Sequence, residues 1–150
     1  MTRQHEVEHH IPTTRIRRLA MITGSCLCGA VGLEIEEPLE KEPEACHCTQ
    51  CRKQTGNFFV GVNVRRTAMR VAGEEHVTWY PSSEKVQRGF CSICGSVLFW
   101  KPTIDGYQWT GVALGCLDTS MKLKIAKHTF VADKGHYYEI TDGAPQLETF

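Results

Sequence analysis

Three cysteines lie within six consecutive positions of the chain, at Cys46, Cys48 and Cys51 in the segment ACHCTQCRK. Cysteine thiolates are the preferred ligands of structural zinc, which is usually held by four protein side chains, whereas catalytic zinc keeps three and leaves one position open. This segment supplies three sulfurs. Either a fourth ligand comes from elsewhere in the chain, or a coordination position is left free for chemistry.

Two further cysteine pairs are similar to each other. Cys26 and Cys28 lie in SCLCGAV, and Cys91 and Cys94 lie in GFCSICGSV. In both segments the last cysteine is followed by glycine, a small residue and valine, as expected of a tight turn whose amides point at metal-bound sulfur. These four cysteines therefore predict a tetrahedral structural zinc site that joins the start of the domain to its middle.

The middle cluster differs because Cys51 is followed by Arg52 and Lys53 instead of glycine. If the other four cysteines bind one metal, then Cys46, Cys48 and Cys51 hold a second, catalytic zinc with an open position. The two basic residues would offset the negative charge of three thiolates around the metal. The alternative is a closed site, in which a fourth ligand comes from Cys116, His47, His128 or His136.

An open zinc site with three cysteines is suited to binding a thiol. Zinc prefers sulfur, and a thiol that it coordinates is deprotonated. Such a thiolate can add to an aldehyde, and the reverse step cleaves a carbon–sulfur bond. A peptide thiol such as glutathione also needs cationic anchors for its carboxylates, and the basic residues near the clusters are Arg52, Lys53, Arg88 and Lys101.

Composition is that of one globular domain. The chain has 150 residues, 41% of them hydrophobic and 23% charged, and 17 basic residues balance 17 acidic ones. A net charge of zero does not favour nucleic-acid binding, which usually needs a basic excess. Eight cysteines without an export signal indicate metal binding in a reducing, cytoplasmic setting rather than a disulfide framework. Cys116, in the apolar run VALGCLDTS, is predicted to be a core residue.

The N-terminal segment reads differently from the rest. Residues 1–20 are predicted to be a flexible polar tail, and residues 21–150 a zinc-binding domain. The first 25 residues lack the apolar core of a signal peptide. No stretch reaches the roughly 18 apolar residues of a membrane-spanning helix.

The body is predicted to be a single, mainly β domain. Alternation of apolar and polar residues predicts a strand over 31–35. Segments rich in β-branched and aromatic residues predict strands over 57–64, 76–80, 96–101 and 107–115. Residues 123–132 fit a strand or a weak helix, and a short turn is expected at Thr119 or Ser120. The clearest helix signal is a short one with Thr49 as N-cap and Gly56 as its stop.

The cysteine motifs together resemble a known family. SCLCGAV, CHCTQCRKQTG, GFCSICGS and the C-terminal HTFV…YYEITDGAPQ are similar to the glutathione-dependent formaldehyde-activating enzymes, a family that also contains centromere protein V. The likeness runs from about Gly24 to Gln146.

This resemblance implies a tent-like β fold with two zinc ions. By the likeness, Cys26, Cys28, Cys91 and Cys94 would be structural ligands, and Cys46, Cys48 and Cys51 would hold the catalytic zinc. The implied activity joins formaldehyde and glutathione into S-hydroxymethylglutathione, with a small-molecule thiol and an aldehyde as partners. Two hypotheses follow: a carbon–sulfur lyase that uses an open zinc, or a zinc-stapled binding module in which both metals are structural.

Overall fold

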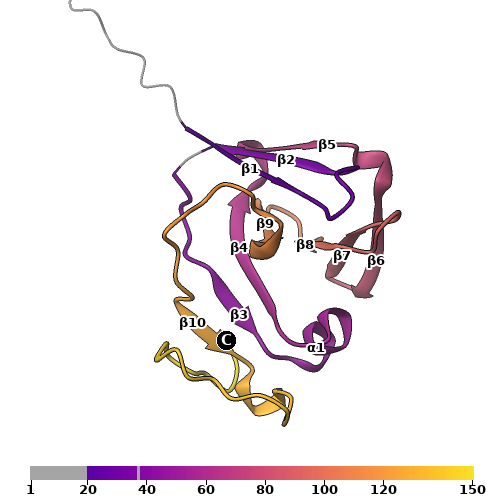
Figure 1. The fold of residues 1–150 in the computed structure, drawn as a ribbon. Helices are drawn as coiled ribbons and strands as arrows, with labels where there is room; N and C mark the ends of the chain where they lie inside the picture. The colour runs from indigo at the N-terminus through magenta and orange to yellow at the C-terminus, as the bar shows by residue number, and fades with distance from the viewer. Residues whose placement is uncertain (1–19, 37) are drawn as a thin grey trace, which may run out of the picture.

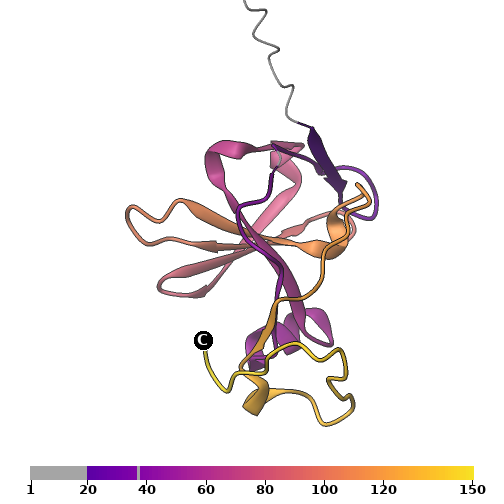
Figure 2. The same cartoon turned by 90° about the vertical axis from the view of Figure 1, so that its left-hand side faces the viewer.

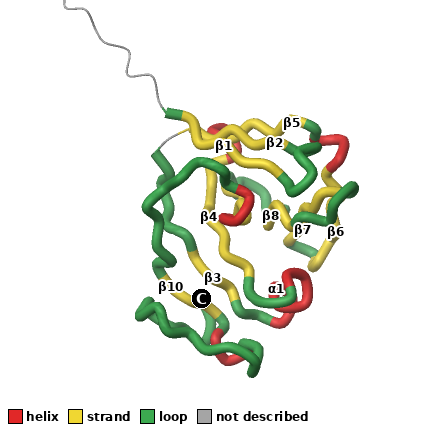
Figure 3. The backbone as a smooth tube through the Cα atoms, viewed as in Figure 1, coloured by secondary structure: helices red, strands yellow, loops and turns green. Residues whose placement is uncertain are grey.

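The computed structural model describes residues 20–36 and 38–150, so the predicted tail lies almost wholly outside the described residues. Within these ranges the chain forms two β-sheets, one short α-helix and several 3-10 turns (Figure 1). Strands and loops make up most of the backbone (Figure 3). The prediction of a single, mainly β domain is confirmed.

The smaller sheet has three antiparallel strands in the order β1-β2-β5. Buried and exposed residues alternate along its first two strands because one face of the sheet packs on the core. Ile22, Leu33 and Ile35 point inward and are at most 2% exposed. The strands are β1 (Met21–Ser25), β2 (Gly32–Glu36) and β5 (Met69–Ala72).

The larger sheet has seven strands in the order β10-β3-β4-β9-β8-β7-β6. All of its neighbouring strands are antiparallel except β10 and β3, which are parallel. The strands are β3 (Glu44–Cys46), β4 (Phe59–Arg65), β6 (Val77–Ser83), β7 (Val86–Cys91), β8 (Val97–Pro102), β9 (Trp109–Ala113) and β10 (Lys127–Thr129).

The main core packs the small sheet against the middle of the large one. Both sheets contribute fully buried aliphatic residues, among them Ile35, Val62, Leu98 and Val112. Figures 1 and 2 show the small sheet at one end of the molecule. At the opposite end lie helix α1 (Thr49–Thr55) and the C-terminal segment beside β10.

Several element predictions need correction. Strands β1, β3, β5 and β7 were not predicted, because they are short or carry polar residues such as Gln87 and Arg88. Helix α1 ends at Gly56 as predicted, in the left-handed conformation, but its N-cap is Cys48 rather than Thr49. Strand β9 stops before a 3-10 turn at Leu114–Cys116.

In the predicted strand or weak helix at 123–132, only Lys127–Thr129 is a strand, followed by a 3-10 turn at Val131–Asp133. No helical turn begins at Thr119 or Ser120. The Thr119 hydroxyl instead accepts a hydrogen bond from the Thr23 amide at 2.8 Å. Among the described residues, no helix has the length and apolar character needed to cross a membrane.

Candidate metal centres and adjoining cavities

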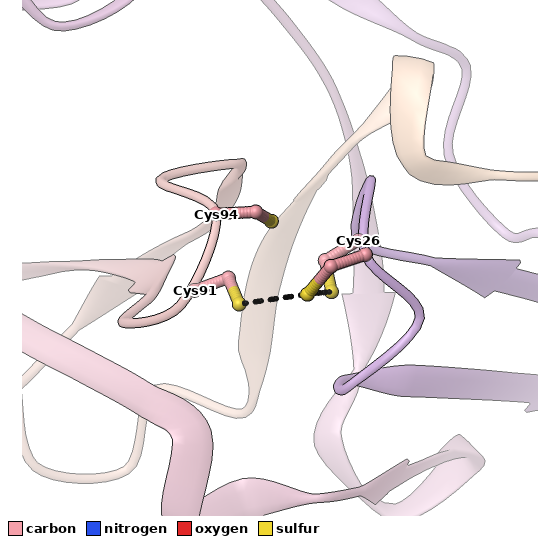
Figure 4. A group of neighbouring side chains, drawn as sticks. Cys26, Cys91 and Cys94 are labelled. Atoms are coloured by element: carbon pink, nitrogen blue, oxygen red, sulfur yellow. Dashed lines mark hydrogen bonds between the residues drawn. The ribbon is translucent and has the colours of Figure 1, made fainter.

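The four cysteines of the two similar motifs converge on one point. Cys26 and Cys28 lie on the turn between β1 and β2, whereas Cys91 ends β7 and Cys94 lies on the turn that follows it. Figure 4 shows Cys26 facing Cys91 and Cys94. All four sulfurs lie within 4.8 Å of one another. The group therefore connects the small sheet to the large one.

Both turns have the backbone that their glycines predicted. Gly29 has a φ of 79° and Gly95 a φ of 77°, which side-chain-bearing residues rarely adopt. The amide of Val31 donates to the Cys26 sulfur at 3.3 Å. Ser96 links the two turns, because its hydroxyl accepts from the Leu27 amide at 2.9 Å and lies 3.3 Å from the Cys94 sulfur.

This donor set fits zinc. Four free thiols from two turns meet without forming a disulfide, and four sulfurs are the ligand set of a closed tetrahedral site. The Ser96 hydroxyl and amide lower the pKa of Cys94 to about 5, which favours the thiolate that a metal requires.

The second group consists of Cys46, Cys48 and Cys51, whose sulfurs also lie within 4.8 Å of one another. Cys46 ends β3, Cys48 caps helix α1, and Cys51 lies in the first turn of that helix at 2% exposure. The Cys51 amide donates to the Cys48 sulfur at 3.5 Å. A strand end followed directly by a helix start thus brings three sulfurs together over six residues.

The three sulfurs strongly perturb one another. Hydrogen bonds from Cys46 and Cys51 lower the pKa of Cys48 to about 2, whereas the neighbouring Cys46 and Cys48 sulfurs raise the pKa of Cys51. A metal cation bound between three sulfurs this close together would allow all three to ionise, because it offsets the repulsion between the thiolates. In the described part of the chain, no histidine, cysteine or carboxylate joins this group as a fourth ligand.

His47 and His128 are instead used in a buried hydrogen-bonded chain. His128 Nε2 faces the Asp142 carboxylate at 2.9 Å, and because a carboxylate only accepts, this nitrogen donates. A neutral His128 then accepts at Nδ1 from His47 Nε2 at 2.8 Å, and His47 Nδ1 accepts from the Tyr138 hydroxyl at 2.6 Å. Burial lowers the pKa of His47 to about 4, in keeping with a neutral ring.

Every ring nitrogen of these two histidines is therefore occupied by a protein partner. These hydrogen bonds connect the Cys46–Cys48 loop to the C-terminal segment that carries Tyr138 and Asp142. These two residues were not singled out in the sequence; the only signal was their place in the YYEITDGAPQ motif.

The other candidates for a fourth ligand lie elsewhere. Cys116 is partly buried, packs against both apolar clusters and donates its thiol to the Val97 carbonyl at 3.2 Å. Burial raises its pKa to about 11, so it stays a thiol. His136 is exposed, with its ring 5.9 Å from that of Tyr137.

Arg88 of β7 makes a direct cationic contact with the three-sulfur group. Its side chain is buried at 4% exposure, and Nη1 donates to the Cys51 sulfur at 3.5 Å. The rest of the guanidinium is held by Gln54 at 3.0 Å, Gln50 at 3.2 Å and Ser82 at 3.2 Å. Because α1 supplies both glutamines, the helix that carries Cys51 also positions the cation beside it.

Two cavities lie next to the three-sulfur group. The one we call the sulfur cavity has a volume of about 250 Å³ and is lined by all three cysteines together with aromatic side chains. The one we call the polar cavity, after Lys53, Gln54 and Ser82 in its lining, has a volume of about 570 Å³ and is also lined by Tyr80, Phe90 and Val97. Gln50 and Arg88 line both cavities and form the border between them.

The remaining predicted anchors differ in position. Lys53 is exposed and lines the polar cavity. Arg52 lines neither cavity, and its buried Nε has no hydrogen-bond partner among the described residues. Lys101 lies over the Trp79 ring, 4.9 Å from its centroid, and lines a separate cavity of about 350 Å³.

Comparisons with known proteins identify relatives for most of this structure. A family model described as glutathione-dependent formaldehyde-activating enzyme matches residues 21–133. A Halomonas elongata protein provisionally named as such an enzyme is 33% identical over 86 residues, covering 53% of this chain and 55% of its own. An uncharacterized lyase of Schizosaccharomyces pombe is 35% identical over 82 residues, covering 53% of this chain and 57% of its own.

The match spans about half the length of these curated relatives. Among solved structures, a Rhodobacter sphaeroides protein from structural genomics is similar with a TM-score of 0.55 and 26% identity. That alignment covers 67% of this chain and 91% of the other.

Proposed function

The chain belongs to the glutathione-dependent formaldehyde-activating enzyme family, and from this membership we propose that it is a zinc-dependent carbon–sulfur lyase. Its substrates are a small thiol of the glutathione type and an aldehyde, and its reaction forms or cleaves their adduct. The thiol sulfur forms a bond to the carbonyl carbon, the C=O π pair moves to oxygen, and that oxygen takes up the proton that the thiol loses.

We assign different roles to the two cysteine groups. Cys26, Cys28, Cys91 and Cys94 hold a structural zinc, because their four sulfurs complete a tetrahedral set. Cys46, Cys48 and Cys51 hold the catalytic zinc with one position free. The zinc at this second site would supply Lewis acidity toward sulfur, which keeps a bound thiol deprotonated near neutral pH.

The single observation that carries the proposal is that the three-sulfur group lines a cavity and has no fourth ligand among the described residues. A purely structural site has no need of an adjoining space. The histidines nearest to the group are fixed by each other, Tyr138 and Asp142, so closing the site with either would break buried hydrogen bonds.

The surrounding residues serve charge and orientation. Three thiolates around a dication sum to a formal charge of −1, and the buried Arg88 guanidinium at 3.5 Å from Cys51 offsets it. If the thiol is a peptide such as glutathione, its charged peptide part binds in the polar cavity, where Lys53 anchors a carboxylate. Arg52 is a second candidate anchor. Eight free cysteines fit a reducing compartment such as the cytoplasm.

The test is the response of the cobalt-substituted protein to a thiol. Sulfur-to-cobalt charge-transfer bands strengthen with each added thiolate, so glutathione should intensify them, and less so at low pH, where thiolate formation is harder. Cys116→Ala should keep this response, because that thiol bonds to a carbonyl and belongs to neither group.

The competing function is a binding module in which both zincs are structural. A cobalt protein whose spectrum already shows four thiolates at both sites and ignores added thiol would favour the module and overturn the lyase proposal.

A further inference from the structure

We propose that the aldehyde handled at the three-sulfur group carries an aromatic or branched-alkyl group, which the sulfur cavity holds, and that formaldehyde is not its best partner. This inference rests on the proposed function and names the substrate class of the same site.

Four aromatic side chains line the sulfur cavity beside the three cysteines. Phe59 and Trp100 come from neighbouring parts of the large sheet, and Phe130 and Phe150 come from the C-terminal part of the chain. The rings of Phe130 and Phe150 meet edge to face, with centroids 4.8 Å apart. Such faces favour apolar and aromatic groups over water.

Phe130 and Phe150 leave aromatic surface exposed to solvent at the cavity. Phe150 is 77% exposed, although it lines the cavity. Phe130 has a φ of 56°, a conformation that a bulky residue adopts only when its surroundings hold it there. Together they place aromatic surface at the cavity where a bound apolar group would remove it from water.

The volume of the cavity exceeds what formaldehyde needs. Formaldehyde has one carbon and one oxygen, whereas an apolar cavity of roughly 150 Å³ accepts benzene. The sulfur cavity measures about 250 Å³. Two glycines, Gly61 and Gly111, line it, and a Cβ at Gly111 would lie in van der Waals contact with Trp100, which also lines the cavity.

Charge argues that the peptide part of the thiol does not fill this space. Among the described residues that line it, the one cation is Arg88, whose guanidinium is already bonded to Cys51, Gln50, Gln54 and Ser82. Glu44 also lines it, and its carboxylate, paired with Lys127 at 3.3 Å, offers no anchor for the carboxylates of a peptide. Lys53 lines the polar cavity, so the peptide part of the thiol binds there and the aldehyde substituent binds in the sulfur cavity.

The experiment compares stable thioethers that imitate the adduct. Binding of S-methylglutathione and S-benzylglutathione to the zinc-loaded protein is measured by calorimetry. Burying a ring of phenylalanine size corresponds to roughly tenfold or more in affinity, so S-benzylglutathione should bind at least about ten times more tightly. Rates of adduct formation with benzaldehyde and formaldehyde provide a second readout.

Gly111→Val narrows the cavity beside Trp100 and should reduce the benzyl-to-methyl affinity ratio toward one. Gly111→Ala is a milder variant, because its methyl group would meet the Trp100 Cβ at an ordinary 3.4 Å, and it should reduce the ratio partly. Gly115→Val is the matched control; Gly115 is exposed, has open space around it and lines neither cavity, so the ratio should stay at the wild-type value.

The outcomes separate the two claims. Equal affinity for both thioethers, or a benzyl preference that Gly111→Val leaves intact, overturns the substrate-class inference while the lyase proposal stands. If neither thioether binds and the cobalt spectrum does not change when glutathione is added, the lyase proposal itself is overturned.

Discussion

Replacing Arg88 by methionine removes the buried cation beside the three-sulfur group while keeping a side chain of similar length. The change deletes the 3.5 Å contact of Nη1 with the Cys51 sulfur and the bonds to Gln50, Gln54 and Ser82. We expect zinc to bind this group more weakly, and we expect the four-sulfur group to keep its affinity, because Arg88 makes no hydrogen bond to it.

The size of the effect follows from the geometry. Unit charges 3.5 Å apart attract by about 5 kcal/mol at an effective dielectric constant of ~20. Much of this is offset because a guanidinium at 4% exposure has already lost its hydration. Removing outer-shell partners of metal ligands typically costs about 10–100-fold in affinity, or roughly 1.4–2.7 kcal/mol. We expect a loss within that range.

The assay is a competitive zinc titration of the reduced protein against a chromophoric chelator, which resolves a tight and a weaker site. Arg66→Met is the matched control, because Arg66 bonds to Thr110 and to the Pro102 carbonyl and to neither cysteine group. Arg88→Lys should fall between wild type and Arg88→Met, since lysine keeps the charge but lacks the planar fork. A folded Arg88→Met protein with both affinities unchanged would refute the assigned role of Arg88.

Three further predictions concern the metals and the buried histidines. Metal analysis of reduced protein should return about two zinc ions per chain, and one or none, after excluding loss in purification, would contradict the two-site assignment. Cys94→Ser should lower the melting temperature more than Cys48→Ser, which should lose one metal and keep most of the structure; the reverse ranking would exchange the two roles. His47→Phe should reduce the free energy of unfolding by about 2–4 kcal/mol in denaturant titrations, because it leaves buried His128 Nδ1 and the Tyr138 hydroxyl without partners. Tyr137→Phe, which removes an exposed hydroxyl bond to the Gly56 carbonyl, is its control and should change stability by less than about 0.5 kcal/mol.

The grouping of the cysteines could be predicted because spacing and glycine carry local geometry. Gly29 and Gly95 mark the turns at which four sulfurs meet, and both adopt the positive φ that the motif requires. The three-residue spacing of Cys48 and Cys51 likewise places both sulfurs on one side of a helix start. Local chemistry of this kind is readable without knowing the fold.

The rest of the site depends on long-range contacts that no local pattern records. Arg88 reaches Cys51 across 37 positions, and His47 meets Tyr138 across 91. Strand β7 was missed for a different reason: its polar Gln87 and Arg88 interrupt the apolar alternation on which strand prediction relies. A strand that serves a polar site does not look like a strand of the core.

The two cysteine groups also differ in the length of chain that they join, and this difference bears on their roles. The sulfurs of Cys28 and Cys91 come together across 63 positions and link the two sheets, so a metal there closes a long loop of the unfolded chain. The Cys46–Cys51 group spans one strand end and one helical turn, so a metal there closes almost no loop and adds little to the stability of the fold. Its geometry is instead maintained from outside, by Arg88 on one side and by the His47–His128–Asp142 chain on the other. A site that contributes little to folding, yet is held in place by buried hydrogen bonds beside a cavity, has the properties expected of a catalytic centre.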